Sequence, residues 1–243
     1  MAPLGRYTEP PAYHVVRKGE TLYAIAWRYG LDYRRIATKN GIGTPYTIFP
    51  GQHLRLVDNV PGYQGSQPKS GRQVTPRWRR HNEHHAWDSA AIVVSHAEPP
   101  VSARPTSDLI EWQWPTRGKL VNRFSDTEQN GIDVSGTLGQ PIFAAATGQV
   151  VYSGGGLSGY GELIIIRHDK HFLSAYAYNN KLLIAEGDRV IGGQRIAEMG
   201  RSRSGEVMLH FEIRRDGRPV NPMRYLPKLS LKEESHVERA RDG

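Results

Sequence analysis

Residues 12–57 carry the apolar pattern of a small mixed domain. Apolar and polar residues alternate at positions 13–16 and again at positions 54–57. Alternation with a period of two is typical of a half-buried strand, so two short strands are expected at the ends of this segment. Their separation leaves room for helices between them.

Two helices are predicted inside that segment. Apolar residues recur at i, i+3, i+4 and i+7 from Leu22 to Tyr29, with Thr21 placed to cap the start and Gly30 to end the helix. A second helix is predicted from its N-cap Asp32 to about residue 41. The resulting order is strand, helix, helix, strand.

The chain from residue 110 onward shows strand periodicity instead. Short β-branched and apolar runs are separated by glycine turns, which predicts a mainly antiparallel sheet over residues 110–227. The runs lie at 141–152, 163–167, 172–178, 187–190, 194–196 and 208–214. Together with the first segment this predicts an α+β protein, ending in a charged, mobile tail at 228–243.

Residues 58–109 show neither the helical nor the strand periodicity of apolar residues. Gly, Pro, Ser, Gln and Arg dominate, so a flexible, basic, disordered linker is predicted. The basic run at 77–80 could bind nucleic acid or anionic lipid. The histidine tract from 81 to 96 could trap a metal. A solvated charge run and disorder are the preferred interpretations, and no nucleic acid partner is expected.

Net charge, cysteine content and the lack of long apolar runs limit the possible binding partners, metal sites and cellular locations. A net charge of +8 suits an anionic polymer, without choosing between cell-wall glycan, lipid headgroups and nucleic acid. The absence of cysteine excludes disulfides, thiolate metal sites and a lipidated cysteine in this sequence. No run approaches the roughly 18 apolar residues of a membrane span, and the first residues do not read as a signal peptide. Either a cytoplasmic protein or a trimmed, exported form is expected.

The first segment resembles the LysM carbohydrate-binding module. The matching positions span the whole unit: Tyr13, Val15, Gly19 to Leu22, Ile25, Ala26, Gly30, Asn40, Ile48, Pro50 to Gln52 and Leu54. The resemblance implies binding of N-acetylglucosamine-containing glycans between the loop before the first helix and the loop after the second. The glycan-binding residues are then expected to be Gly19, Glu20, Thr21, Leu22, Tyr23, Ile48, Phe49, Pro50 and Gly51, although Leu22 and Ile48 also read as core.

The second domain resembles the LytM/lysostaphin-type peptidoglycan peptidases. Their zinc pattern is His-x3-Asp, then Tyr-Ala-His, then His-x-His-Phe-Glu. Here the ligand positions fall on Gln129, Asp133 and His210, while Tyr178 and Met208 stand where the family has its other histidines. A catalytic zinc needs about three His, carboxylate or thiolate ligands and an open position. Only Asp133 and His210 remain, so no metal, no cofactor and no catalytic residue are expected.

The remaining frame is interpreted as a partner-docking groove. Its expected residues are Gln129, Asp133, Tyr160, Tyr176, Tyr178, Arg201, Arg203, Met208 and His210. Ordinary sheet packing remains an alternative for Tyr176 and Met208. Without a metal, Asp133 and His210 are expected to hydrogen-bond to each other.

Residues 112–227 most closely resemble the NlpD-like branch, on Ser158 to Gly161, the run Leu-Ser-Ala-Tyr-Ala and the ending from Val220 to Pro227. The resemblance implies a non-catalytic peptidoglycan-binding activator of periplasmic N-acetylmuramyl-L-alanine amidases in septal wall splitting and cell separation. It also implies a periplasmic location and a lipid anchor in the outer membrane. Such an anchor is attached to a cysteine, and this sequence contains none. The alternatives are a zinc endopeptidase that recruits His168 or His171, and a plain cell-wall tether.

Overall fold

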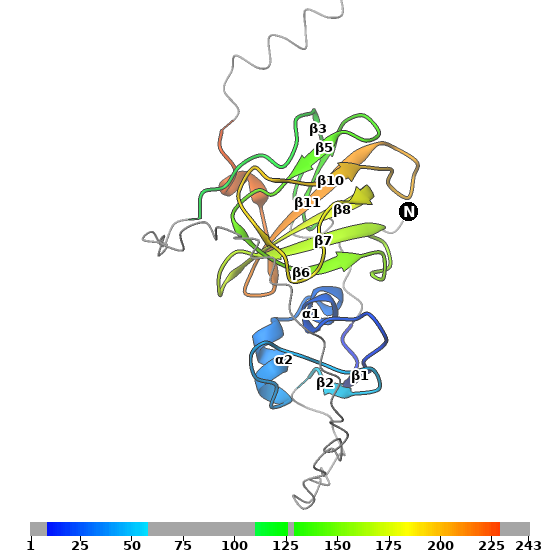
Figure 1. Cartoon of the computed structure of the whole chain (residues 1–243), viewed down its shortest axis with the longest axis vertical. Coiled ribbons are helices and arrows are strands. Elements are labelled where there is room, and N and C mark those ends of the chain that lie inside the picture. Colours follow the sequence, from blue (N-terminus) through cyan, green and yellow to red (C-terminus); the bar gives the residue numbers. More distant parts are fainter. Residues whose placement is uncertain (1–8, 58–109, 126–128, 229–243) are drawn as a thin grey trace, which may run out of the picture. The chain divides into compact units, whose positions relative to one another are not determined.

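The computed structural model describes residues 9–57, 110–125 and 129–228 (Figure 1). We call residues 9–57 the N-terminal module and residues 110–228, as far as they are described, the β-domain. Both lie in one compact unit of the chain. The linker predicted at 58–109 lies outside the described residues, as does the predicted tail beyond residue 228.

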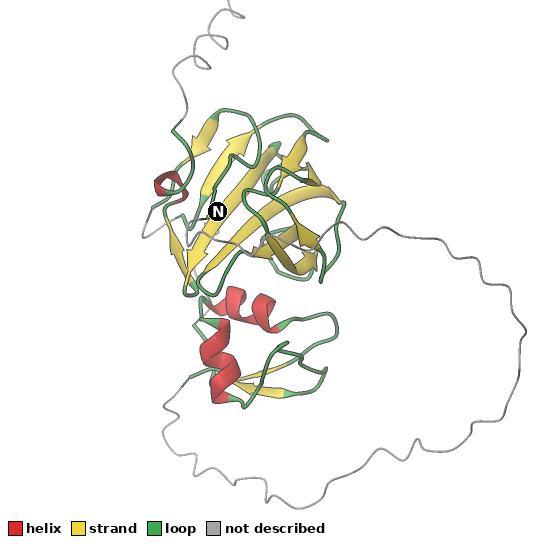
Figure 2. Ribbon diagram, turned by 60° about the vertical axis from the view of Figure 1, so that its left-hand side comes forward, coloured by secondary structure: helices red, strands yellow, loops and turns green. Residues whose placement is uncertain are grey.

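The N-terminal module has the predicted βααβ order. Its elements are β1 (Tyr13–Val15), α1 (Leu22–Tyr29), α2 (Tyr33–Lys39) and β2 (His53–Arg55). The two strands pair antiparallel, with His14 opposite Leu54. Within the described residues, both α-helices belong to the N-terminal module (Figure 2).

Capping fixes both helices where the sequence predicts. The Thr21 hydroxyl accepts a hydrogen bond from the Ala24 amide at 3.1 Å, which satisfies one of the free amides at the start of α1. Gly30 ends α1 in the left-handed region with φ 64°, a conformation that favours glycine. The Asp32 carboxylate caps α2 by accepting from the Arg34 amide at 2.9 Å. None of the helices in the described ranges is long and apolar enough for a membrane crossing.

The β-domain is a mainly antiparallel sheet, as predicted. Its elements are β3 (Leu120–Asn122), β4 (Ile132–Ser135), β5 (Pro141–Phe143), β6 (Gly148–Gly154), β7 (Glu162–Arg167), β8 (Phe172–Leu182), β9 (Arg189–Val190), β10 (Arg195–Met199), β11 (Met208–Arg215), β12 (Arg218–Val220) and the short 3-10 helix η1 (Pro222–Arg224). The strand order is β3-β4-β11-β8-β7-β6-β9, and β10 pairs with β5 and β8. The central strands β11, β8, β7 and β6 follow one another in Figure 1.

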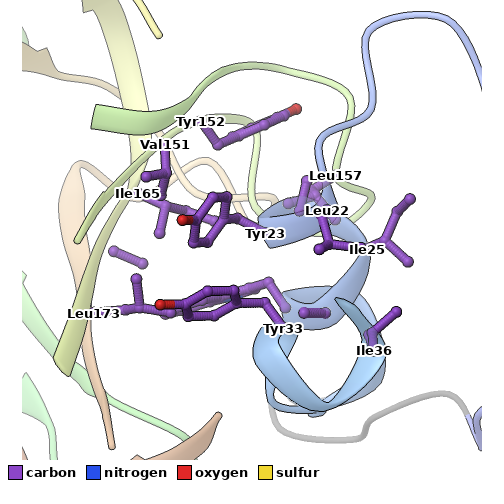
Figure 3. Packing of buried hydrophobic residues seen from close by; sticks show 14 of the residues in the cluster. Leu22, Tyr23, Ile25, Tyr33, Ile36, Val151, Tyr152, Leu157, Ile165 and Leu173 are labelled. Atoms are coloured by element: carbon purple, nitrogen blue, oxygen red, sulfur yellow. The ribbon is translucent and has the colours of Figure 1, made fainter. Parts of the chain in front are cut away.

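The sheet has two differently buried faces. Side chains such as Ile164, Tyr176 and Phe211 pack on one side, which we call the inner face. Ile165 and Leu173 point to the other side, the outer face, where they share a hydrophobic cluster with α1. Figure 3 shows these outer-face side chains turned toward Tyr23 and Tyr33 of the N-terminal module. The outer face also carries the candidate site.

Candidate functional site

Strand β11 places the candidate site in the middle of the sheet. It pairs with β4, with His210 directly opposite Asp133, and with β8, with His210 opposite Ala177. Strand alternation puts Leu209, Phe211 and Ile213 on the inner face. The alternate residues His210, Glu212 and Arg214 therefore share the outer face.

These residues form a continuous polar chain, which we call the ion-pair chain: Asp133, His210, Glu212 and Arg214. The Nδ1 atom of His210 lies 2.6 Å from Asp133 Oδ1, and its Nε2 atom lies 3.1 Å from Glu212 Oε1. Arg214 donates from Nε to Glu212 Oε2 at 3.0 Å. His210 and Glu212 are fully buried, so the chain is shielded from water.

Neighbouring polar groups complete both carboxylates. Asp133 Oδ2 accepts hydrogen bonds from two side-chain amides, Asn122 Nδ2 at 2.8 Å and Gln129 Nε2 at 2.9 Å. The Tyr160 hydroxyl donates to Glu212 Oε1 at 2.9 Å. Each buried carboxylate thus has several donors, which is what a buried charge requires.

The electrostatics make every member of the chain charged at neutral pH. Burial by itself lowers the pKa of His210, but hydrogen bonds and the charges of Asp133 and Glu212 raise it to about 9. Burial raises the pKa of both carboxyls, and this is outweighed by His210 at Asp133 and by Arg214 and His210 at Glu212, so both pKa values are lowered. Two anions alternate with two cations, and the buried charges balance.

This arrangement does not fit the zinc that the fold family implies. Two ligands of a tetrahedral zinc lie about 3.3 Å apart when each bond is about 2.0 Å, so a 2.6 Å contact between Asp133 and His210 leaves no room for the ion between them. Gln129 turns its amide nitrogen, a donor, toward Asp133. Across the described ranges no group of three His, Cys, Asp or Glu side chains could hold a metal.

The histidines of the enzyme alternative lie elsewhere. His168 bonds to the Thr147 carbonyl at 2.9 Å and to the Ser174 hydroxyl at 2.7 Å. Ser174 is three residues before Ala177 on β8, which separates it from His210 by about 10 Å along the strand. His171 pairs with Asp216 at 2.8 Å. Neither imidazole is available to complete a ligand set with Asp133.

Tyrosine rings flank the ion-pair chain. The ring centroids of Tyr160 and Tyr178 lie 6.1 and 6.0 Å from that of His210. Burial, followed by the charge of Asp133, raises the pKa of Tyr178 to about 12, so its phenol stays protonated. Met208 precedes His210 by two residues on the same strand face and is 6% exposed.

The structure brings together most of the predicted groove residues but separates one. Gln129, Asp133, Tyr160, Tyr178 and His210 meet around the ion-pair chain. Tyr176 does not: it is fully buried on the inner face, where its hydroxyl accepts from the Ala145 amide at 2.7 Å. The expected groove contact at Tyr176 is therefore wrong, and the alternative of ordinary sheet packing is confirmed for this residue.

The residues of the predicted groove differ in exposure. Arg201 and Arg203 are exposed, and Arg201 donates from Nη1 to the Gly205 carbonyl at 2.8 Å. Tyr160, Tyr178 and Met208 are at most 9% exposed. The site is thus a nearly closed surface with a basic rim rather than an open groove.

Sequence reasoning missed Asn122, Glu212 and Arg214 as members of the site. A signal for two of them was present. His210, Glu212 and Arg214 alternate along a strand whose other residues are apolar, and such alternation places all three charges on one face. Asn122 belongs to a different strand, and nothing local points to it.

The predicted glycan-binding residues divide into exposed and covered groups. Gly19, Phe49, Pro50 and Gly51 are exposed, with Phe49 at 66%. The Gly51 amide donates to the Val16 carbonyl at 2.8 Å, which ties the second predicted loop to the residue that follows β1. Leu22 and Tyr23 are buried at 1% and 8%.

Two of the predicted glycan contacts brace the module itself. Glu20 accepts from the Arg17 amide at 2.9 Å and from Arg28 at 2.6 Å, and it lies 2.7 Å from His14 Nε2. Thr21 serves as the N-cap of α1. Ile48 is partly buried against the hydrophobic cluster.

Comparison with known proteins matches both domains. Residues 14–57 match the LysM domain model and residues 127–222 match peptidase family M23. The chain is 40% identical over 230 residues to "Lipoprotein NlpD/LppB homolog" of Pseudomonas aeruginosa, covering 88% of this chain and 77% of that protein.

Two further relatives extend the comparison. "Murein hydrolase activator NlpD" of Salmonella typhimurium is 40% identical over 268 residues, which cover 93% of this chain and 71% of that protein. "Outer membrane antigenic lipoprotein B" of Haemophilus influenzae is 35% identical over 261 residues, which cover 88% of this chain and 63% of that protein. With a LysM module joined to an M23-type domain and relatives of this identity and coverage, the chain belongs to the NlpD/LppB family.

Proposed function

We propose that the chain is a non-catalytic, peptidoglycan-binding activator of a periplasmic N-acetylmuramyl-L-alanine amidase, acting in septal wall splitting and cell separation. The observation that carries the proposal is the ion-pair chain, which occupies the frame where M23-type peptidases hold zinc. The murein hydrolase activator named among the relatives supports the same conclusion.

The replaced residues cannot supply hydrolytic chemistry. Met208 has a thioether, which cannot donate a proton. Tyr178 has a pKa raised by burial to about 12, too high for a general base near neutral pH. His210 holds its proton between two carboxylates. A protein with this site would bind a partner rather than activate water.

The partner surface is proposed at the basic rim. Arg201 and Arg203 are exposed; the charge of Arg203 acts on Tyr178, and Arg201 forms a β-bridge with Val207, the residue before Met208. Exposed guanidinium groups suit carboxylates of an amidase. Tyr178 and Met208, which keep 7% and 6% exposure, would supply a small apolar contact beside them. Charge at the rim would contribute most to the association rate and to specificity.

Peptidoglycan is proposed to bind the exposed loops of the N-terminal module. The exposed Phe49 ring can cover an apolar sugar face, and the backbone of Gly19 and Gly51 is accessible to an acetamide group. The net charge of +8 favours approach to an acidic wall. Two relatives named as lipoproteins support a periplasmic location, with outer-membrane anchoring in the native precursor.

The test is dye release from labelled sacculi, together with the metal content of the purified protein. We expect no stoichiometric zinc, no release by the protein alone and release when an amidase is added. The variant Arg201→Glu/Arg203→Glu should reduce the stimulated release about tenfold or more, because it places like charges against an acidic partner. The matched control is Arg189→Glu, an exposed charge on β9 at the opposite end of the sheet order.

Each contrary outcome has a distinct meaning. Release by the protein alone with one equivalent of zinc would establish the endopeptidase alternative. Binding to sacculi without any stimulation of an amidase would leave the cell-wall tether. Equal loss in the rim variant and in the β9 control would remove the rim from the interface.

A further inference from the structure

Helix α1 is buried on every side, which its sequence alone does not require. A helix that packs only on its own module leaves its opposite side in water. Residues 22–27 of α1 are consecutive, and all six are buried. Six consecutive residues pass more than once around a helix, so α1 has two neighbours. One is its own module, and the other is the outer face of the sheet.

The apolar part of this contact joins residues that are far apart in sequence. Leu22, Ile25 and Trp27 of α1 belong to the same hydrophobic cluster as Val151, Leu157, Ile165 and Leu173 of the β-domain. Figure 3 shows Leu22 and Tyr23 turned toward Val151, Leu157 and Ile165.

Three hydrogen bonds fix α1 on the sheet along its length. At its start, the Thr21 hydroxyl donates to the Val151 carbonyl at 3.2 Å. In its first turn, Arg167 donates from Nη1 to the Tyr23 hydroxyl at 2.7 Å. Near its end, Arg214 donates from Nη1 to the Trp27 carbonyl at 2.8 Å, with its guanidinium 3.4 Å from the centroid of the Trp27 ring. A cation at a helix C-terminus is favoured by the helix dipole.

An ion pair at α2 adds a fourth connection. Arg34 lies 2.5 Å from Asp216 of the β-domain, and Asp216 also pairs with His171 at 2.8 Å. Asp216 is 44% exposed, so this pair is screened by water and contributes little to stability. Screened pairs of this kind suit a contact that opens.

The same contact covers half of the proposed glycan site. Leu22 and Tyr23 are buried at 1% and 8%, and the Thr21 hydroxyl and the Tyr23 hydroxyl are engaged by the β-domain. The other half, with Phe49 at 66%, stays exposed. A sugar bound only at the exposed half leaves the contact intact. A glycan strand that extends to Tyr23 must displace the sheet.

We propose that the outer face of the β-domain is a docking surface for the chain's own N-terminal module, and that a peptidoglycan glycan strand competes with it for Thr21 and Tyr23. This inference rests on the glycan binding proposed above. Opening uncovers Ile165 and Leu173 and removes the Trp27 carbonyl from Arg214, the last member of the ion-pair chain. The wall polymer thereby changes the surface next to the candidate site.

Competition predicts a gain of glycan affinity from changes made outside the glycan module. Arg167→Ala and Asp216→Asn both lie in the β-domain and remove contacts to Tyr23 and Arg34. We expect Arg167→Ala to tighten binding of a soluble N-acetylglucosamine pentamer to the full chain about three- to tenfold, because the open state becomes more populated. Asp216→Asn removes only a screened pair and should tighten binding about twofold. Arg35→Ala, an exposed change on α2, is the control and should leave affinity unchanged.

A distance measurement reports opening directly. The chain has no cysteine, so Thr38→Cys and Lys170→Cys, at exposed positions of the two domains, can carry a pair of spectroscopic labels. The labels should move apart when the pentamer is added at saturation. The labelled chain should keep the melting temperature of the original chain. An unchanged melting temperature distinguishes opening of the contact from unfolding of either domain.

The possible results separate this inference from the proposed function. Tighter binding in the two β-domain variants and a longer label distance support competition. Pentamer binding with an unchanged distance and unchanged affinity in Arg167→Ala and Asp216→Asn would overturn the docking inference and leave glycan binding intact. A full chain that binds neither the pentamer nor sacculi would overturn glycan recognition itself.

Discussion

Two histidines of the β-domain differ in protonation state. His168 bonds to the Thr147 carbonyl and the Ser174 hydroxyl, and burial lowers its pKa to about 4. His210 lies between the carboxylates of Asp133 and Glu212, and although burial by itself lowers its pKa, these partners raise it to about 9. At neutral pH the first imidazole is neutral and the second is a cation.

The difference teaches that burial decides the state of an imidazole whose hydrogen-bond partners are neutral, as at His168, whereas neighbouring carboxylates outweigh burial at His210. The His168 network is neutral and joins Thr147, Ser174 and Tyr176 through hydrogen bonds, as expected of a core. The His210 network is charged and lies at positions that align with the zinc-ligand pattern of the peptidase family. A protonated imidazole and Arg214 now balance the carboxylates that remain.

The largest expected effect comes from removing one charge of the ion-pair chain. Glu212→Gln keeps the size of the side chain but leaves Arg214 and His210 with one anion fewer in a fully buried site. Breaking a buried pair typically costs about 3 to 5 kcal/mol of unfolding free energy. Chemical denaturation of the purified variant measures this loss.

A matched control on an exposed ion pair measures how much of this loss is due to burial. Glu198 pairs with Arg195 at 3.0 Å, the same distance that separates Glu212 from Arg214, but the Glu198 pair is 24% and 47% exposed. Glu198→Gln should cost about 1 kcal/mol or less. Equal losses in the two variants would show that the ion-pair chain is no more important than a surface pair.

The opposite pKa shifts predict opposite pH windows. His210, with a pKa raised from 6.5 to about 9, contributes stability that is complete below pH 6.5 and is lost as the pH rises through about 9. His168, with a pKa lowered from 6.5 to about 4, contributes stability that is complete above pH 6.5 and is lost as the pH falls toward 4. Each window should be worth about 1 to 3 kcal/mol.

Denaturation at pH 5, 6.5, 8 and 9.5 checks both windows. His168→Gln should remove the part of the acid slope that this group causes and leave the alkaline slope unchanged. An acid slope that stays the same in His168→Gln would mean that other groups cause it.

Local features of the chain were predictable, and the reason is visible at the helices. The caps Thr21 and Asp32 and the left-handed Gly30 act within a few residues, so sequence spacing specifies them. The hydrogen bond between Asp133 and His210 was also predicted, because the family pattern aligns both residues. Residue placement across the sheet was harder.

The error at Tyr176 has a conformational cause. Two residues apart on a regular strand, Tyr176 and Tyr178 should share a face. Tyr178 has φ 64°, a left-handed conformation that is uncommon outside glycine. It breaks the alternation, so Tyr176 enters the inner core while Tyr178 flanks His210. No sequence pattern indicates this conformation.

The burial of α1 could not be predicted either. Its apolar stripe Leu22, Ile25 and Ala26 predicts one buried side. Tyr23 and Trp27 are buried as well because they contact β-domain residues more than a hundred positions later in the chain. Such contacts depend on the fold of both domains and not on any local period.

A smaller effect is expected in the neutral network. Ser174 is fully buried and bridges His168 and Tyr176. Ser174→Ala removes one partner from each, which should cost about 1 to 2 kcal/mol. The exposed Ser158→Ala serves as the control. A loss as large as that of Glu212→Gln would contradict the distinction between neutral and charged networks.

The smallest change in stability is expected from Gln129→His, which replaces one amide donor of Asp133 at a partly buried position and should alter the unfolding free energy by about 0.5 kcal/mol. Its effect on metal binding should be much larger. The variant has two imidazoles and one carboxylate in the family's ligand positions, the minimum for a zinc site. Titration calorimetry should detect zinc binding to the variant and no zinc binding to the original chain.

The pH dependence of that binding connects it to His210. Zinc must displace the proton that His210 shares with Asp133, and the pKa of His210 is raised to about 9. The zinc affinity of Gln129→His should therefore rise about tenfold per pH unit between pH 7 and 9. Gln129→Asn and Gln129→His/His210→Ala should bind no zinc. Because Met208 and Tyr178 remain, zinc in the variant should restore no cleavage of sacculi, and cleavage would show that the lost histidines are dispensable.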